Sequence, residues 1–227
     1  MAASAEPGQL IVTADDWGYC RRYNAGIAEA ARARAIDAVS ALVLRPDCDP
    51  AIAETGVEIG LHLEPPDPGS QREPYDAPRR QAESFGQLFG GPPAYIDGHH
   101  HCHAALPMAT AVEDLALELG VPVRSVGEDH RRRLLERGIA TADRTVGRTD
   151  EGEPALPRSL TDALAENVLP PGTTEWVVHP GYRDSRAGSS YDRGREEDLA
   201  LVLELSAENI LAEGRATHRA ALGGASA

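Results

Sequence analysis

The 227-residue chain contains no lysine, so all 22 of its cationic side chains are arginines. This absence excludes mechanisms that pass through a lysine Schiff base or use a lysine as general base. It also excludes a phosphate-binding P-loop, which requires a lysine. No Gly-x-Ser-x-Gly sequence occurs, so the nucleophile elbow of the serine hydrolases is absent as well.

Positive charge is scarce, and the formal net charge is −14. The chain therefore lacks the basic footprint of a nucleic-acid-binding protein, and an anionic membrane surface would repel it. No uninterrupted apolar run approaches the roughly 20 residues that span a bilayer, and the N-terminus has no signal-peptide pattern. We expect a cytoplasmic protein that binds neither nucleic acid nor membrane.

Cysteine and aromatic residues are also few. The three cysteines, Cys20, Cys48 and Cys102, form no Cys-x-x-Cys pair, which fits a reducing compartment better than a disulfide scaffold. Aromatic residues make up only 4% of the chain, whereas hydrophobic residues make up 41%. The sequence therefore predicts a core built mainly from aliphatic side chains.

Short apolar runs alternate with helical patterns along the chain. We expect strands at 10–12, 39–44, 57–61, 94–97, 121–124 and 175–178, and helices at 21–35, 107–119, 159–168 and 195–213. This alternation is typical of an α/β fold with a mainly parallel sheet or a β/α barrel.

The chain shows no internal repeat and no clear linker. We therefore expect a single catalytic domain over 1–227, with an ordered core at about 9–213 and flexible termini. Residues 64–80 read as a long loop, 127–157 follow no clear pattern, and either segment could set substrate specificity. The sequence leaves the oligomeric state open, with a homodimer as one alternative.

Four predicted strands end in polar side chains: Asp15-Asp16, His62, Asp97 and His179. In β/α folds the carboxyl ends of the strands gather around one site. Each residue has an ordinary alternative, such as a turn acid, a core histidine or a turn histidine. Their shared position at strand ends favours a common site.

The segment Asp97-Gly98-His99-His100-His101-Cys102-His103 holds four of the eight histidines. If the strand before it continued, alternation would place Asp97, His99, His101 and His103 on one face. Histidine is the commonest metal ligand in proteins, and a nearby carboxylate can orient the ring. The pattern indicates a metal or catalytic site, and an exposed histidine-rich loop is the alternative.

Asp15 and Asp16 are adjacent at a strand end, where neighbouring side chains diverge. One carboxylate could then bind a metal while the other accepts a proton. Trp17 follows them and could stack on a ring of a substrate or pack in the core.

These elements together resemble the YdjC/ChbG family of carbohydrate deacetylases. The matching motifs are Thr13-Ala14-Asp15-Asp16-Trp17-Gly18, Asn24-x-Gly26-Ile27, Gly60-x-His62-Leu63, Ile96 through His103, Gly120-Val121-Pro122-Val123-Arg124, and Glu175 through His179-Pro180-Gly181 with Asp184. They occur in the family's order across most of the chain. Thr13 and Trp17 stand where the family usually has asparagine and phenylalanine.

The resemblance implies an irregular, TIM-barrel-like (β/α) barrel and an enzyme that removes N-acetyl groups from amino sugars or short chitin-like oligosaccharides. It implies that Asp16, His62 and His99 hold a divalent metal ion, with Asp15 as the catalytic base and His179 as the acid.

Several points stay open from the sequence. Zn, Mg, Mn and Co all suit mixed nitrogen and oxygen ligands. Asp97, His101, His103 and Arg124 could contact the substrate or support the ligands. A metal-dependent phosphoesterase or amidohydrolase is a second reading of the function, and a non-catalytic metal- or sugar-binding protein is a third.

Overall fold

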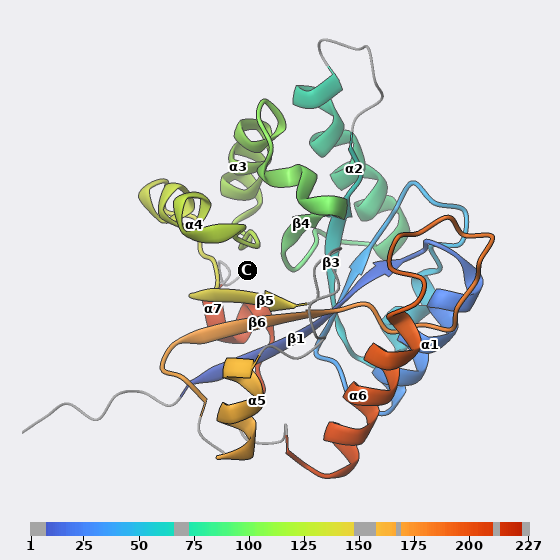
Figure 1. The fold of residues 1–227 in the computed structure, drawn as a ribbon. Helices are drawn as coiled ribbons and strands as arrows, with labels where there is room; N and C mark the ends of the chain where they lie inside the picture. Colours follow the sequence, from blue (N-terminus) through green and yellow to red (C-terminus); the bar gives the residue numbers. More distant parts are fainter. Residues whose placement is uncertain (1–7, 66–72, 148–157, 167–168, 211–213, 224–227) are drawn as a thin grey trace, which may run out of the picture.

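The fold is built on one parallel sheet of six strands (Figure 1). The computed structural model describes residues 8–65, 73–147, 158–166, 169–210 and 214–223. The strands are β1 (Gln9–Trp17), β2 (Ala38–Ala41), β3 (Glu58–Leu63), β4 (Ile96–Gly98), β5 (Arg144–Gly147) and β6 (Thr173–Val178). They lie in the order β4-β3-β2-β1-β6-β5, and every pair is parallel. The predicted α/β class is confirmed.

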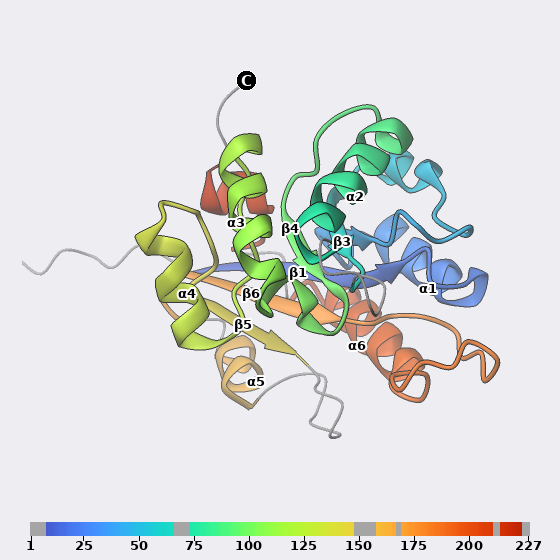
Figure 2. The ribbon, with the colours of Figure 1, turned by 90° about the horizontal axis from the view of Figure 1, so that it is seen from above.

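The sheet curls into part of a barrel, and helices cover it. These are α1 (Arg21–Arg32), α2 (Glu73–Phe89), α3 (Met108–Leu119), α4 (Gly127–Glu136), α5 (Arg158–Ala165), α6 (Arg195–Ala207) and α7 (His218–Leu222), with 3-10 helices η1 (Pro50–Thr55) and η2 (His99–Ala104). Helix α1 packs against α6, and α2 packs against α3. Viewed from above, β1, β5 and β6 run side by side in one direction (Figure 2).

The core is aliphatic, as the composition predicts, and is formed mostly by buried alanine, valine, leucine and isoleucine. Trp176 on β6 is fully buried and is the largest such side chain. No helix in the described ranges is both long and apolar enough to cross a bilayer.

Helix α1 lies directly against the segment that follows β6. A Cβ atom on Gly26 would lie only 2.6 Å from the Cα of Gly181. The two motifs that contain these glycines are far apart in sequence, and this close approach brings them together. It fixes the chain immediately after His179.

Parts of the predicted secondary structure are wrong. Residues 73–80 belong to α2, whereas 66–72 lie outside the described residues. Residues 127–157, which follow no clear pattern in the sequence, contain α4 and β5. Residues 148–157 of this range lie outside the described residues. The predicted strand 121–124 is reduced to one bridge between Ile96 and Val123. Residues 64 and 65 are the described part of the predicted loop before α2.

The C-terminal segment contains α7, and the structure describes it as far as residue 223. Thr217 caps α7 by accepting a hydrogen bond from the backbone N–H of Ala220. His218 is buried, and its ring stacks on Tyr95 with centroids 3.6 Å apart. A long-range contact orders this segment, so local composition could not reveal it. The first seven and last four residues lie outside the described residues.

Candidate active site

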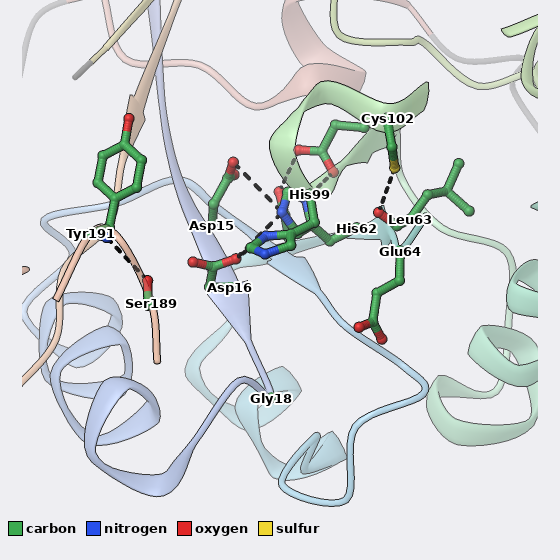
Figure 3. Close-up of polar contacts among 12 residues, drawn as sticks. Asp15, Asp16, Gly18, His62, Leu63, Glu64, His99, Cys102, Ser189 and Tyr191 are labelled. Carbon is green, nitrogen blue, oxygen red and sulfur yellow. Dashed lines mark hydrogen bonds and ion pairs between the residues drawn. The ribbon is translucent and has the colours of Figure 1, made fainter. Parts of the chain in front are cut away.

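Side chains from β1, β3 and η2 converge at the carboxyl ends of the strands (Figure 3). One potential ligand atom from each of Asp16, His62 and His99 lies within 4.8 Å of the others. Asp16 Oδ1 is 2.9 Å from His99 Nδ1 and 3.5 Å from His62 Nε2. The sequence-predicted residues of three separate segments therefore meet at one point.

The backbone conformation at the end of β1 directs the adjacent carboxylates of Asp15 and Asp16 to different partners. Asp16 has a φ of 74°, and the pairing of β1 with β2 is irregular between Ala14 and Trp17. A left-handed conformation in a residue other than glycine costs about 1–3 kcal/mol and is concentrated at functional sites. Asp16 consequently faces His62 and His99, whereas Asp15 faces Arg124.

The residues present fit a divalent metal ion. Asp16 Oδ1 is buried and has no hydrogen-bond partner among the described residues, although two imidazole nitrogens lie close to it. His62 Nδ1 is 2.7 Å from Asp97 Oδ1. A carboxylate there accepts the Nδ1 proton, so Nε2 is the ring nitrogen that faces the site.

Burial favours the neutral ring of His62, but Asp97 and Asp15 outweigh burial and raise its pKa to about 10. Without a metal ion, the His62 ring is therefore in its protonated, positively charged form. Binding of a cation through Nε2 would release that proton, as is usual when histidine becomes a ligand.

Asp97 is the centre of a buried hydrogen-bond network. Its Oδ2 accepts a hydrogen bond of 2.7 Å from Ser40 Oγ and lies 2.7 Å from a terminal nitrogen of Arg124. Ser40 Oγ also lies 3.0 Å from the Tyr95 hydroxyl. These contacts fix the carboxylate that orients His62, so Asp97 lies behind the ligand set.

Arg124 holds Asp15 through both terminal nitrogens, at 2.7 and 2.8 Å. Its Nε donates to Glu175 Oε1 at 3.0 Å. Burial opposes ionisation of Asp15, but Arg124 and His62 outweigh burial and hold its pKa far below the usual value. Asp15 is therefore an ionised acceptor beside His62, from whose Nε2 its Oδ2 lies 3.9 Å away.

His179 follows β6 on the other side of the site. Its backbone N–H donates to Asp198 Oδ2 at 2.9 Å, and its ring stacks on Tyr191 with centroids 4.3 Å apart. Burial lowers the pKa of His179, while the charges of Asp16 and Asp15 act in the opposite direction. The ring Nδ1 is buried and has no hydrogen-bond partner among the described residues.

The histidine cluster does not form one face, and the predicted extension of the strand is wrong. Strand β4 ends at Gly98, and His100 and His101 adopt left-handed conformations within η2. Cys102 Sγ donates to the carbonyl of Leu63 and anchors this turn to β3. His99 consequently reaches Asp16, whereas His101 is exposed to solvent.

His103 is fully buried behind the site, where its Nε2 lies 2.9 Å from the carbonyl oxygen of Arg124. It therefore contacts the backbone of the arginine that holds Asp15 and does not reach the cluster of Asp16, His62 and His99.

Trp17 packs in the core and is only 5% exposed. Its indole Nε1 donates to the carbonyl of Asp49 at 3.0 Å. The ring is therefore buried, which favours the packing alternative over stacking on a sugar ring.

Sequence reasoning missed Arg195 and Tyr19. Arg195 begins α6 and contacts Asp16, and Tyr19 lies beside His99 with ring centroids 5.7 Å apart. Arginine is common throughout this chain, and no spacing marks Arg195, so the sequence held no usable signal for it.

Comparisons with known proteins show the family of the chain. The family model described as YdjC-like protein matches residues 9–77 and 66–213. A carbohydrate deacetylase of Geobacillus stearothermophilus is 28% identical over 228 residues, which cover 87% of this chain and 90% of that protein. A chitooligosaccharide deacetylase of Proteus mirabilis is 28% identical over 241 residues, with 90% and 94% coverage.

Solved structures share the fold. A protein of Enterococcus faecalis with a provisional assignment to cellobiose-phosphate cleavage superposes with a TM-score of 0.74 at 21% identity, covering 92% of this chain and 95% of that one. A peptidoglycan N-acetylglucosamine deacetylase gives a TM-score of 0.53 at 13% identity, with 98% and 91% coverage. With the family model matching most of its length, the chain belongs to the YdjC-like family, the YdjC/ChbG family that its motifs resemble.

Proposed function

We propose that this protein is a metal-dependent deacetylase that hydrolyses the acetamide of N-acetylated amino sugars or short chitin-like oligosaccharides. One observation carries the proposal: the three candidate ligands Asp16, His62 and His99 converge beside a separate ionised carboxylate, Asp15. A site that only stored metal would need no additional carboxylate held in place by an arginine. The related carbohydrate and chitooligosaccharide deacetylases suggest the substrate class.

Asp16, His62 and His99 would hold the ion. A divalent ion at such a site lowers the pKa of water and polarises a carbonyl group. Two imidazole ligands and one carboxylate ligand suit Zn, Co or Mn. Mg remains an alternative because it binds carboxylate oxygen. With three protein ligands, positions remain open for water and substrate, as catalytic sites require.

Asp15 would accept the proton of the attacking water at a carboxylate oxygen. The two bonds from Arg124 fix the plane of this carboxylate and keep it ionised. An acceptor with so low a pKa is a weak base in free solution. Orientation and an already acidified water would compensate for that weakness.

His179 would deliver a proton to the departing amine nitrogen as the carbon–nitrogen bond breaks. Because burial lowers its pKa, the resting ring is mostly neutral at neutral pH. The nearby carboxylates of Asp15 and Asp16 favour its protonated form and would let it take up the proton that it delivers. Stacking on Tyr191 sets the ring plane.

The test is acetate release from N-acetylglucosamine oligomers by protein loaded in turn with Zn, Mn, Co or Mg. We expect acetate and free amine in equal amounts, and no product after EDTA treatment. A phosphate-ester panel run in parallel addresses the phosphoesterase alternative. Phosphate release without acetate release would overturn the proposal, and so would stoichiometric metal binding without turnover on either panel.

A further inference from the structure

Arg195 lies buried between an aromatic ring and a candidate metal ligand. It is the first residue of α6 and is 0% exposed. Its guanidinium carbon lies 3.6 Å from the centroid of the Tyr23 ring on α1. One terminal nitrogen donates to Asp16 Oδ2 at 2.5 Å.

This placement leaves much of the guanidinium without hydrogen bonds. Its Nε and Nη1 are buried and have no hydrogen-bond partner among the described residues. A buried charge is costly unless it is paired and fully hydrogen-bonded. Within the described part of the chain, the ion pair with Asp16 and the contact with Tyr23 are thus the closest interactions of the guanidinium, and Ser189 Oγ lies 3.5 Å from its Nη2. A purely structural arginine would gain more by bonding to backbone carbonyls.

The two oxygens of Asp16 are divided between different partners. Oδ2 is bound by Arg195, whereas Oδ1 faces the nitrogens of His62 and His99. Tyr23 in turn is fixed by a hydrogen bond of 3.0 Å from its hydroxyl to Asp192 Oδ1. The guanidinium therefore cannot turn away from Oδ2 without losing its stacking partner.

We propose that Arg195 is a positioning residue that limits Asp16 to one ligand oxygen, so that a bound cation keeps positions open for water and substrate. This inference rests on the proposed function. A carboxylate released from Arg195 could offer both oxygens to the ion. A second protein oxygen on the ion would compete with the molecules that must react there.

The experiment compares Co²⁺ binding to the wild-type protein, Arg195→Gln and Arg195→Lys. Visible absorption reports the coordination of Co²⁺, because its d–d bands weaken as the number of ligands rises. We expect Arg195→Gln to bind Co²⁺ as tightly as wild type or more tightly, because the site loses a positive charge. Its absorption should weaken, and kcat should fall about 10- to 100-fold, as for other partners of metal ligands.

Arg195→Lys keeps the charge and one donor to Oδ2. It should recover the wild-type spectrum and most of kcat, and it also serves if the glutamine variant fails to fold. Arg186→Gln is the matched control, because Arg186 is exposed and pairs only locally with Asp184. It should match wild type in both spectrum and kcat.

Three outcomes would overturn the inference. An unchanged Co²⁺ spectrum in folded Arg195→Gln would show that Arg195 does not control how Asp16 binds. Loss of Co²⁺ binding by that folded variant would show that the arginine is needed to build the site and does not limit it. Binding of none of Zn, Mn, Co and Mg by the wild-type protein would overturn the proposed function and this inference together, whereas the first two outcomes leave the proposed function intact.

Discussion

Arg124 donates to both carboxylate oxygens of Asp15, and the same guanidinium lies within 2.9 Å of Glu175 and 2.7 Å of Asp97. One buried cation thus holds three buried carboxylates, from β1, β4 and β6. Arg124, which orients the candidate base, therefore also neutralises part of the buried negative charge inside the barrel.

Arg124→Met should destabilise the protein strongly, because it leaves three carboxylates buried without their cation. Removing one partner of a buried ion pair typically costs about 3–5 kcal/mol. Urea denaturation at pH 7 measures this change. Arg79→Gln is the control, because the Arg79–Glu118 pair is exposed and should contribute nothing measurable. Equal stability of the two variants would contradict the assigned role of Arg124.

Asp16→Ala and Asp15→Asn should separate metal binding from turnover. Loss of the Asp16 carboxylate removes a candidate ligand, so both metal binding and acetate release should disappear. Asp15→Asn keeps the ligand set but removes the proton acceptor, so the metal content should stay at the wild-type level while kcat collapses. Metal analysis after gel filtration, together with an acetate assay, checks both. Full activity of Asp16→Ala would refute the assignment of the ligand.

Asp97→Asn should weaken metal affinity by about 10- to 100-fold, the usual effect of losing a carboxylate behind a ligand histidine. Its charge helps to fix the tautomer of His62 that presents Nε2 to the site. Competition with a chromogenic chelator measures the affinity. Ser40→Ala removes a hydrogen bond from Oδ2 of the same carboxylate but leaves its charge, and we expect a much smaller effect. A larger effect in Ser40→Ala than in Asp97→Asn would contradict this explanation.

Gly26→Ala should destabilise the fold by about 1–3 kcal/mol, the usual cost of overpacking. The new methyl group would lie 2.6 Å from the Cα of Gly181 and would push α1 away from the segment that carries His179. Gly86→Ala is the matched control, because a Cβ atom at that α2 position would meet one atom within 4 Å, at 3.9 Å, among the described residues outside the helix's own backbone. Alanine there should stabilise the helix by about 0.5–1 kcal/mol. Thermal unfolding of both variants distinguishes the two glycines.

His103 should make stability fall as the pH falls. Burial lowers its folded-state pKa to about 3, whereas the unfolded value is about 6.5. Its contribution is therefore fully present above pH 6.5 and is lost toward pH 3, at about 1.4 kcal/mol per pH unit. The physical reason is that Nδ1 is buried and has no hydrogen-bond partner among the residues that the structure describes, so a proton added there would be unsatisfied.

Urea denaturation at pH 7 and pH 5 tests this dependence. The difference between the two pH values should be smaller by about 2 kcal/mol in His103→Gln than in the wild-type protein. The same pH dependence in both proteins would show that His103 does not titrate in this way.

The sequence by itself determined the parallel α/β pattern and the placement of acidic and histidine side chains at strand ends. Apolar runs bounded by polar residues are local features, and the carboxyl ends of parallel strands must meet at one edge. The sequence alone therefore predicts that Asp15, Asp16 and His62 lie together, and the structure brings them together with His99.

Periodicity could not choose which histidine of the cluster meets Asp16; the family resemblance implied His99, and the tertiary structure shows how His99 reaches that carboxylate. The chain reverses at His100 and His101, and Cys102 is anchored to the carbonyl of Leu63, which is distant in sequence. Periodicity assumes a continued strand, so it cannot foresee a turn imposed by a neighbouring strand. The burial of Trp17 was decided in the same way, by packing against residues that local pattern does not specify.

The positions of Arg195 and His218 likewise depend on packing that the local sequence pattern does not specify. Each is separated from its acidic partner by more than forty residues, and neither lies in a recognisable motif. Their positions depend on how α6 and α7 close against the sheet. The sequence determined which strands end in reactive side chains, and the packing of distant helices decided which charges hold them in place.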